Sequence, residues 1–460
     1  STGIAELSPK YLAEAVSSAL PLGYKHTDVG VIPDDWDVSP LSTMTSLMTN
    51  GFVGTAKTHY TDSHDGVTYI QGYNVEENGF NFNGIKRVTP EFHKKNSKSC
   101  LRTGDVLMVQ TGDVGLVTIV PQELEGANCH ALIISRFKKE IYDPKYFSYY
   151  LNSQQGRLRL KELETGTTMK HINVGDLLHF EVPYPRAKKE QTAIANALSD
   201  VDALISALEK LIAKKQAIKT ATMQQLLTGR TRLPQFALRD DGTPKGTKPS
   251  ELGEIPEDWE VNCFAECGYF QSGSGFPTKY QGEQEGDYPF FKVSDMNNVG
   301  NEIFLISSNN YISESVKNSI SAKVIPQNAI VFAKIGAAIF LERKKMCFQP
   351  SCIDNNMMAY IANEDKLQFK YAYFLFKNIN LGQLVEATAL PSLSGRDIGQ
   401  KIVALPAAEE QTAIATILSD MDEEIQALEQ RLGKTRQIKQ GMMQELLTGK
   451  TRLIKGEAHG

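Results

Sequence analysis

Two carboxylates and a lysine in the second half of the chain, Asp354, Glu364 and Lys366, have the spacing of some magnesium-dependent nuclease sites. Oxygen ligands of this kind hold Mg²⁺ in proteins. The pattern is permissive, however, and the first half of the chain has no counterpart to it. The stretch from Glu364 to Lys366 is more typical of a solvated loop, so we expect no catalytic metal site here.

No other catalytic signature is found in the sequence. It contains no GxxxxGK[ST] phosphate loop, no HExxH zinc motif and no GxSxG nucleophile elbow. It also lacks any Pro-Pro pair, so the NPPY or DPPY loop of amino-methyltransferases is missing. The cysteine pairs Cys263/Cys267 and Cys347/Cys352 do not have the spacing of zinc knuckles and are expected to be reduced thiols. These observations predict a protein that is not an enzyme and holds no metal.

The framework that would position binding residues is duplicated. Residues Glu190–Leu233 recur as Glu410–Leu453 without a gap, and more than half of the paired positions are identical. A shorter pair, Lys25–Val38 and Lys248–Val261, precedes them. Between each short segment and its long one lies a body of about one domain's length, and the two bodies barely resemble each other. A constant framework with two divergent bodies indicates one scaffold that presents two different recognition surfaces.

Each long repeat predicts a helix that begins after a proline, Pro185 or Pro406, and ends at a glycine, Gly229 or Gly449. Apolar residues recur along both helices at alternating steps of four and three, which is the pattern of a coiled-coil seam. The seam residues are Ile194, Leu198, Val201, Ile205, Leu208 and Ile212 in the first copy, and Ile414, Leu418, Met421, Ile425, Leu428 and Leu432 in the second. Two similar seams in one chain favour an intramolecular antiparallel pair. The alternative is that each helix packs on its own domain or on another chain.

The two bodies share a pattern of β-rich segments despite their low identity. These segments are 66–75, 105–112, 116–121, 130–137 and 177–185 in the first body, and 288–296, 329–336, 355–362 and 397–406 in the second. A helical segment at 146–153 corresponds to one at 371–378. The predicted fold class is therefore α+β, with two similar mixed α/β domains joined by two long helices that form an antiparallel coiled coil with a pseudo-two-fold internal repeat.

The predicted boundaries follow the repeat. They are an N-terminal helical segment at 1–24, with an amphipathic helix at Ile4–Leu20, a first domain at 25–185, a first spacer helix at 186–232, a linker at 233–250, a second domain at 251–405, a second spacer helix at 406–455 and a tail at 456–460.

Charge gives no general attraction to nucleic acid, because the net charge is −5. Residues 186–250 alone have a clear excess of Lys and Arg, so any DNA contact must rest on a local patch. The basic residues after the first helix bind phosphate or solvate a linker, two alternatives of equal weight; they are Arg230, Arg232, Arg239, Lys245 and Lys248. No apolar run reaches the ~18 residues of a membrane span, and the first residues lack the features of a signal peptide. We therefore expect a cytoplasmic protein without a membrane partner.

Three motifs carry a resemblance to a known family. They are GEIPEDWEV (Gly253–Val261), PAAEEQTAIA (Pro406–Ala415) and LLTGxTRL, which occurs twice, at Leu226–Leu233 and Leu446–Leu453. Together and in this order they resemble the specificity subunit of type I restriction–modification enzymes, over nearly the whole chain. The resemblance implies two target-recognition domains, each reading one half of an asymmetric bipartite site in double-stranded DNA. It also implies that the two helices set the gap between the halves and dock two methyltransferase subunits.

The resemblance implies that this chain binds no cofactor itself. S-adenosylmethionine, used to methylate adenine N6, would belong to the methyltransferase subunits, and ATP with Mg²⁺ to the restriction (translocase) subunits. The rival hypothesis is a non-catalytic coiled-coil adaptor whose two bodies bind proteins, which the acidic second body favours. The family motifs favour DNA recognition.

Candidate DNA-binding residues follow from the hydrogen bonds that base edges and phosphates accept and donate. In the first body they are Lys57, His59, Tyr60, Gln71, Tyr73, Asn74, Gln110, Thr111, Thr168, Lys170 and His171, the last three in a segment that matches the family's Gly-Thr-Thr loop. In the second body they are Ser274, Lys279, Tyr280, Lys292, Ser294, Lys334, Ser392, Ser394 and Arg396. Asn328 and Ala329 stand where the first body has a Gly-Asp turn, which weakens the alignment of Lys334 with Gln110. The equivalent Trp36 and Trp259 are expected to anchor their domains rather than stack on bases.

Overall fold

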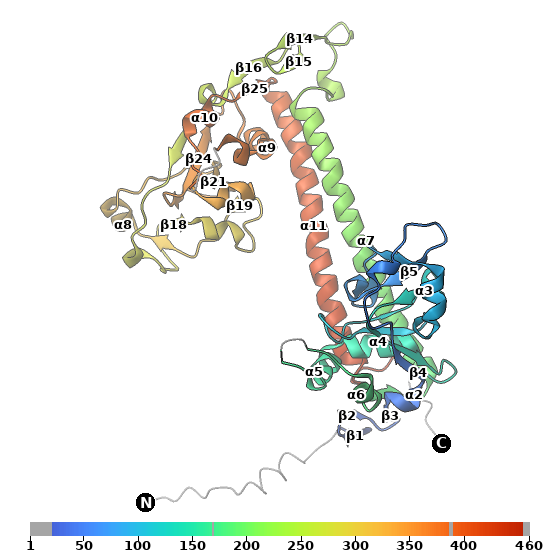
Figure 1. Ribbon diagram of the computed structural model, residues 1–460. Coiled ribbons are helices and arrows are strands. Elements are labelled where there is room, and N and C mark those ends of the chain that lie inside the picture. The colour runs from blue at the N-terminus through green and yellow to red at the C-terminus, as the bar shows by residue number, and fades with distance from the viewer. Residues whose placement is uncertain (1–20, 168–169, 386–389, 454–460) are drawn as a thin grey trace, which may run out of the picture. The chain divides into compact units, whose positions relative to one another are not determined.

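Short β-rich segments separated by turns fold into several small sheets, and the chain also forms two long amphipathic helices (Figure 1). The computed structural model describes residues 21–167, 170–385 and 390–453. The chain divides into two units. Unit 1 comprises Ser1–Glu209 and Arg431–Gly460, and unit 2 comprises Lys210–Gln430. Each long helix therefore contributes one half to each unit. The helix predicted at Ile4–Leu20 lies outside the described residues.

Unit 1 contains a four-stranded sheet in the order β10-β9-β12-β4 and a three-stranded sheet in the order β11-β5-β8. Their bounds are β4 Thr45–Asn50, β5 Val67–Ile70, β8 Lys86–Val88, β9 Val106–Val109, β10 Val117–Ile119, β11 Asn128–Cys129 and β12 Leu132–Phe137. Three two-stranded pairs are β1 Tyr24–Thr27 with β2 Gly30–Pro33, β3 Trp36–Pro40 with β13 Glu181–Pro185, and β6 Val75–Glu76 with β7 Gly79–Phe80. The short α-helices are α2 Leu41–Met44, α3 Pro90–Lys95, α4 Pro144–Asn152, α5 Gln154–Glu162 and α6 Val174–Leu178.

Unit 2 repeats this arrangement. Its larger sheet has the order β17-β24-β21-β22-β19, and its smaller one the order β20-β18-β23. Their bounds are β17 Gly268–Ser272, β18 Tyr288–Phe291, β19 Phe304–Leu305, β20 Tyr311–Ile312, β21 Ile330–Ala333, β22 Lys344–Cys347, β23 Cys352–Ile353 and β24 Met357–Ala362. Two-stranded pairs are β14 Thr247–Ser250 with β15 Gly253–Pro256, and β16 Glu260–Cys263 with β25 Ile402–Leu405. The short α-helices are α8 Glu314–Ser319, α9 Phe369–Asn378 and α10 Gly395–Gly399.

The two units share their strand order. Each strand of the four-stranded sheet in unit 1 has a counterpart at the same position in unit 2, where β19 is added at the edge. The three-stranded sheets also match, including the parallel pairing of β11 with β5 and of β23 with β18. This correspondence confirms the predicted α+β fold of two similar domains. Four of the β-rich segments were assigned too long. Segments 177–185 and 397–406 begin inside α6 and α10, because Asn173 and Ser394 each start a short helix there. Segments 66–75 and 288–296 extend into the 3-10 turns η2 (Gly72–Asn74) and η8 (Val293–Asn297).

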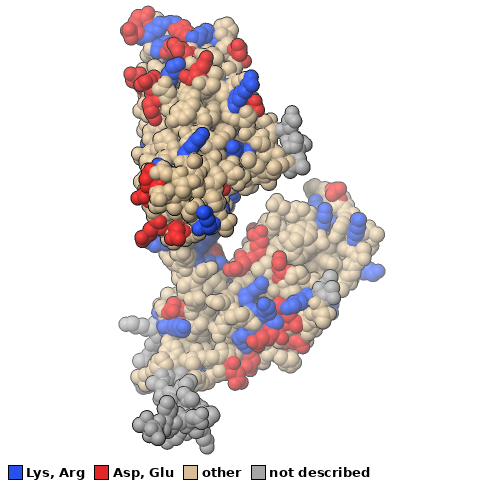
Figure 2. All heavy atoms as spheres, turned by 90° about the vertical axis from the view of Figure 1, so that its left-hand side faces the viewer, with Lys and Arg blue, Asp and Glu red and all other residues tan. Residues whose placement is uncertain are grey.

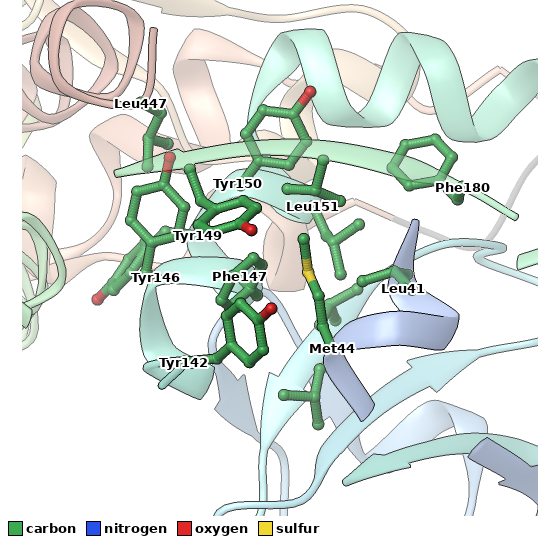
Figure 3. Packing of buried hydrophobic residues seen from close by; sticks show 14 of the residues in the cluster. Leu41, Met44, Tyr142, Tyr146, Phe147, Tyr149, Tyr150, Leu151, Phe180 and Leu447 are labelled. Carbon is green, nitrogen blue, oxygen red and sulfur yellow. The ribbon is translucent and has the colours of Figure 1, made fainter. Parts of the chain in front are cut away.

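An aromatic helix forms the centre of the unit 1 core. The Asp143 side chain caps α4 by accepting a hydrogen bond from the Lys145 backbone, and Pro144 stands at the first helical position. Figure 3 shows the α4 rings grouped against Leu41 and Met44 of α2. The corresponding helix of unit 2, α9, is buried among aromatic residues in the same way. Burying each large side chain contributes about 1.5–3 kcal/mol, so these helices hold the sheets in place.

The long helices are α7 (Lys188–Leu227) and α11 (Ala408–Leu446). Both begin shortly after the predicted prolines. Both end just before the predicted glycines, Gly229 and Gly449, whose φ angles of 68° and 71° are left-handed. The residues from there to 232 and to 453, which the sequence analysis had included in the spacer helices, lie beyond the helix ends. Residues 454 and 455, also included there, lie outside the described residues.

Within each unit the two helix halves pack antiparallel. In unit 1, Asp202 pairs with Lys439 at 2.8 Å, and Glu209, farther along α7, pairs with Arg436, earlier in α11, at 2.6 Å. The same reversal occurs in unit 2. There Lys215 pairs with Glu424 at 2.7 Å, and Lys219, one turn later, pairs with Asp422. Each of the twelve predicted seam residues is buried or half-buried.

The helix ends are built into the domain cores. Ile194 and Leu198 of α7 belong to the same apolar cluster as Met443 and Leu446 of α11 in unit 1. In unit 2 the equivalent residues of the other helix copy, Ile414 and Leu418, cluster with Leu226 and Leu227. Each copy of the repeat therefore contributes its ends to the domain cores and its middle to the pairing with the other copy.

An arginine clamp closes unit 2 at the end of α7. Arg232 donates two hydrogen bonds to the buried Glu410, both of 2.7 Å, and two to Asp258, of 2.8 and 3.2 Å. The Trp259 indole N–H donates to the same Glu410 at 3.2 Å. Burial of Asp258 is outweighed by its hydrogen bonds to Arg232 and Lys245, which lower the pKa of this carboxyl to about 2. The full burial of Trp259 agrees with the expected anchoring role.

The equivalent clamp closes unit 1 with the last described turn of the chain. Arg452 donates to the buried Glu190 at 2.7 Å and to Asp35 at 2.7 and 2.9 Å. The Tyr24 hydroxyl donates to the Gly449 carbonyl at 3.0 Å, which ties the β1–β2 hairpin to the same place. Residues from both ends of the chain thus meet in one structural unit.

The contacts around the unit 2 clamp involve the basic residues after the first helix. Arg232 and Lys245 are held by Asp258, and Arg239 pairs with Glu257 at 2.7 Å. These three cations already have carboxylate partners in unit 2. Their contacts favour the structural alternative over phosphate binding.

Substitution of Gly229 by alanine is expected to destabilise unit 2. The left-handed backbone alone costs about 1–2 kcal/mol with a side chain, and a Cβ would lie 2.5 Å from the Pro256 ring. Gly441 in α11 provides a control of opposite sign, because it has open space and sits in a helix, where alanine stabilises by about 0.5–1 kcal/mol. Thermal unfolding of both variants measures the difference. Equal behaviour of the two would contradict the assigned cap.

Candidate nucleic-acid interface

In unit 1 the structure joins most of the predicted DNA-binding segments into one rim. The loop after β4 pairs with the end of β11 through the bridge Phe52–His130, and the His130 N–H donates to Ile70 at 2.8 Å. Gln71 follows Ile70 directly, and a Cβ on the next residue, Gly72, would lie 3.9 Å from the Thr111 carbonyl. We call these residues, together with Gln110, Thr111, Thr165 and His171, the unit 1 rim.

The loop that contains His171 closes the unit 1 rim. Thr111 bridges His171, and His171 in turn bridges Thr165. The Ile172 N–H donates to the Gln110 carbonyl at 3.3 Å. Segments 110–112 and 167–171, which are distant in sequence, are therefore neighbours, although Thr168 and Met169 lie outside the described residues.

A small aromatic cluster supports the rim from below. The Tyr69 ring is fully buried and contacts the rings of Tyr60, Phe92 and His130 at centroid distances of 6.2, 5.9 and 6.1 Å. The Phe52 ring packs edge-on against Phe92 at 4.9 Å. Rigid rings beneath a loop fix its backbone, so the polar side chains of the rim are carried on an ordered base.

Unit 2 carries a rim with the same backbone plan. The bridge Ser274–Asp354 takes the place of Phe52–His130, and the Asp354 N–H donates to Phe291 at 3.0 Å. Ile335 bridges Ser392, as Thr111 bridges His171. We call Ser274, Asp354, Ile335 and Ser392, with the loops that contain them, the unit 2 rim.

The match between Lys334 and Gln110 is supported by two observations. The carbonyl of Lys334 accepts from Leu393 N–H at 2.8 Å, as that of Gln110 accepts from Ile172. Asn328 has a left-handed φ of 68°, close to the 83° of Gly104, and asparagine is one of the few residues that tolerates this region. The turn before the strand therefore has the same geometry in both units although its sequence differs. This supports the alignment of Lys334 with Gln110.

Exposure separates the predicted residues of unit 1. Lys57, His59, Tyr73, Thr111 and Lys170 are exposed. The half-buried residues are Tyr60, Gln71, Gln110 and His171. Each of these remains a predicted DNA contact.

Asn74 requires a correction. Its side chain has an exposed fraction of 0%, its Oδ1 accepts from the Gln71 N–H at 3.0 Å, and its Nδ2 donates to the Asn81 carbonyl at 2.9 Å. Both amide groups are used inside the protein, so Asn74 holds the turn of η2 (Gly72–Asn74). Nothing in the sequence separates it from the nearby Gln71, since both are amides in one short polar run.

In unit 2 the predicted residues also differ in their roles. Exposed positions are Lys279, Ser294, Ser392, Ser394 and Arg396, and half-buried ones are Ser274, Tyr280, Lys292 and Lys334. The Lys334 ammonium donates to the Ser272 hydroxyl at 3.1 Å, and the Lys292 ammonium to the Gln281 side chain at 3.0 Å. These two lysines are therefore oriented by neutral partners and keep donors for a ligand. The Ser394 hydroxyl instead caps α10 by accepting from the Arg396 N–H.

The nuclease-like triplet is not assembled. Strand β24 separates Asp354 from Glu364 and Lys366, and its six residues span about 20 Å. The Glu364 carboxyl accepts from the Phe369 N–H, at the start of α9. Among the described residues there is no group of three or more His, Cys, Asp or Glu side chains that could hold a metal ion.

Charge on the surface is mixed. On the face drawn in Figure 2, Lys and Arg side chains are interspersed with Asp and Glu rather than gathered into one basic area. Attraction for a polyanion on this face must therefore come from individual side chains over short distances. Across the three described ranges, no helix is both long enough and apolar enough to cross a membrane.

Comparisons with known proteins agree with the duplicated fold. A family model described as "Type I restriction modification DNA specificity domain" matches twice, at residues 33–220 and 256–440. The MjaIX type I restriction enzyme specificity subunit of Methanocaldococcus jannaschii is 22% identical over 443 residues, which cover 94% of this chain and 96% of that protein. The MjaVIII specificity subunit of the same organism is 28% identical over 325 residues, covering 69% and 72%.

Two solved structures have the same fold. The S subunit of a type I restriction-modification system from M. genitalium has a TM-score of 0.56 at 18% identity, covering 89% of this chain and 96% of its own. A chain from a study of complex assembly and conformational transition of the type I R-M system has a TM-score of 0.52 at 15% identity, covering 91% and 99%.

Proposed function

The chain belongs to the type I restriction–modification DNA specificity family, and on this basis we propose that its two units read the two halves of one asymmetric bipartite DNA site. The observation that carries the proposal is the pair of rims. They share bridges, turns and strand order, yet the side chains on them differ. A protein that reads two different half-sites needs this combination of a common backbone and unlike hydrogen-bonding groups.

Selection of bound duplexes from a random DNA pool tests the proposed function. The chain is co-expressed with a type I methyltransferase subunit, and the purified complex is used for selection. An asymmetric motif of two short specific halves around a gap of fixed length is expected. Enrichment of no motif by a stable complex would favour the protein-adaptor hypothesis, and a single contiguous motif would mean that one unit alone reads DNA.

We propose further that the long helices dock two methyltransferase subunits. In unit 2, Leu211 and Ile218 of α7 are seven residues apart, and their exposed fractions are 39% and 42%. Apolar residues repeated at this spacing lie on one helix face, where a partner helix would cover them. S-adenosylmethionine would then be held by the methyltransferase subunits, and ATP with Mg²⁺ by restriction subunits that join the complex.

Lengthening both helices is expected to widen the gap in the recognised site. Insertion of four residues after Glu209 and after Gln430 adds slightly more than one turn, about 6 Å, to the spacer. At 3.4 Å per base pair this corresponds to one or two more base pairs between the half-sites. The motif selected by the lengthened protein in complex with its methyltransferase measures the gap. The half-site sequences serve as the internal control, since they should stay the same, and an unchanged gap would contradict the spacer role.

A further inference from the structure

One rim position is fixed in backbone but different in chemistry between the two units. His130 in unit 1 and Asp354 in unit 2 each follow the last residue of the matching strand, β11 or β23. Each makes the same isolated bridge and donates its N–H to the strand beside it, at 2.8 and 3.0 Å. Neither residue was among the DNA-binding candidates drawn from the sequence, where Asp354 was considered only as part of the nuclease-like triplet.

Glycines enforce this backbone arrangement. A Cβ on Gly51 would lie 2.8 Å from the carbonyl oxygen of Cys129, and a Cβ on Gly273 would lie 1.9 Å from that of Asp354. The two chain segments can approach so closely in both units because glycine stands at the crossing. The crossing therefore places an imidazole in one unit where it places a carboxylate in the other.

The hydrogen bond from Tyr69 defines which nitrogen of His130 carries the proton. The Tyr69 hydroxyl lies 3.2 Å from His130 Nδ1. Burial raises the pKa of Tyr69, so the hydroxyl keeps its proton. Within the described ranges His130 Nδ1 is the one hydrogen-bond partner found for this hydroxyl, so we assign Nδ1 as the acceptor of its proton. Burial also lowers the pKa of His130, which favours the neutral ring. With Nδ1 accepting, the ring hydrogen is on Nε2, which makes this atom a donor.

Asp354 offers the opposite polarity. One carboxylate oxygen accepts from the Asn356 N–H at 2.9 Å, which fixes the side chain. The exposed fraction of Asp354 is 6%, and this burial raises the pKa of its carboxyl. The hydrogen bonds from Asn356 and the positive charge of Lys292 oppose that effect. An ionised carboxylate is an acceptor only, so it pairs with amino groups rather than with carbonyl or ring-nitrogen acceptors.

We propose that His130 and Asp354 determine sequence specificity in their respective half-sites. His130 donates from Nε2 to a base-edge acceptor, such as guanine O6 or N7, and Asp354 accepts from an exocyclic amino group of cytosine or adenine. This inference rests on the proposed DNA-reading function and adds to it the atoms that read. Tyr69 acts as a positioning residue, since it fixes the His130 tautomer without contacting DNA.

The experiment compares motifs selected from a random pool by the methyltransferase complex of each variant. Asp354→Asn is expected to change base preference at one position of one half-site, because the amide both donates and accepts. His130→Gln is expected to change one position of the other half-site. Each half-site is the control for the other. His179→Gln, at an exposed site after α6, is the matched control and should leave the motif unchanged.

Tyr69→Phe keeps the buried ring but removes the hydroxyl. It is expected to broaden base preference at the same position that His130→Gln alters, with little change elsewhere. A purely structural role would lower the thermal midpoint without altering the motif. Loss of 10-fold or more in discrimination at that one position corresponds to about 1.4 kcal/mol.

The outcomes separate the two levels of the proposal. If the unaltered complex selects no bipartite motif, the proposed function fails. If it selects one and all three variants select the same motif, the DNA-reading function stands and the assignment of His130 and Asp354 is overturned. If a variant changes both half-sites alike, the position does not read a base, and the assignment is again overturned.

Discussion

Replacing Arg232 by methionine is expected to lower the free energy of unfolding of unit 2 by about 3–5 kcal/mol. The substitution removes four hydrogen bonds and leaves Glu410, whose exposed fraction is 2%, as a buried carboxylate without its cation. Denaturant unfolding, with hydrogen exchange of unit 2 amides as the readout, measures the effect. The Trp259 indole still donates to Glu410, but one neutral hydrogen bond does not replace a bidentate guanidinium.

Two further variants test the cause of this loss. Arg239→Met removes a cation that pairs with Glu257 at the surface, so its expected effect is below about 1 kcal/mol. The double variant Arg232→Met/Glu410→Leu removes both buried charges and should recover much of the stability lost by the single change. An Arg232→Met protein as stable as Arg239→Met would show that the buried pair contributes nothing.

A fragment that ends at Leu233 is expected to form a homodimer. In the full chain, unit 1 needs the second half of α11 and the segment up to Arg452. The fragment retains the corresponding residues of the first copy, including Leu226, Leu227 and Arg232, which are the equivalents of Leu446, Leu447 and Arg452. Each protomer can therefore supply to its partner what the missing half of the chain supplied. Light scattering measures the mass, and selection with the methyltransferase should give a palindrome built from one half-site.

Arg232→Glu in the fragment provides the matched test of the dimer. A glutamate opposite Glu190 of the partner protomer places two buried carboxylates together, so the dimer should weaken by several kcal/mol. A fragment that stays a folded monomer at micromolar concentration would contradict the idea that the two copies are interchangeable.

The sequence allowed the framework to be predicted better than the site. The long helices, their proline and glycine limits and the duplicated body all follow from repeated residues, because local signals and apolar periodicity act within one segment. The strand order depends on contacts between distant segments, and it was visible only as a shared spacing of β-rich stretches. The lengths of segments 177–185 and 397–406 were wrong because a single helical turn leaves no periodic pattern.

The rim residues show where a single sequence stops being informative. Asn74 and Gln71 are similar amides three positions apart, yet one closes a turn inside the protein and the other is half-buried at the rim. His130 was not considered because nothing local marks it. His130 follows Cys129 as Asp354 follows Ile353, at the ends of matching strands. This equivalence becomes visible only when the two units are compared strand by strand.

The arginine clamp of unit 1 has a consequence for biosynthesis. Glu190 emerges from the ribosome long before Arg452, because all of unit 2 must be translated in between. At about 5–20 residues per second the nascent chain spends roughly 13–52 s with this carboxylate lacking its cation. During that time Arg232 is already present, but it lies beyond the other end of the 40-residue helix α7 and cannot reach Glu190 of its own chain. On one polysome, Arg232 of one nascent chain can pair with Glu190 of a neighbouring chain. Slow translation of the second half should therefore increase misassembly between chains.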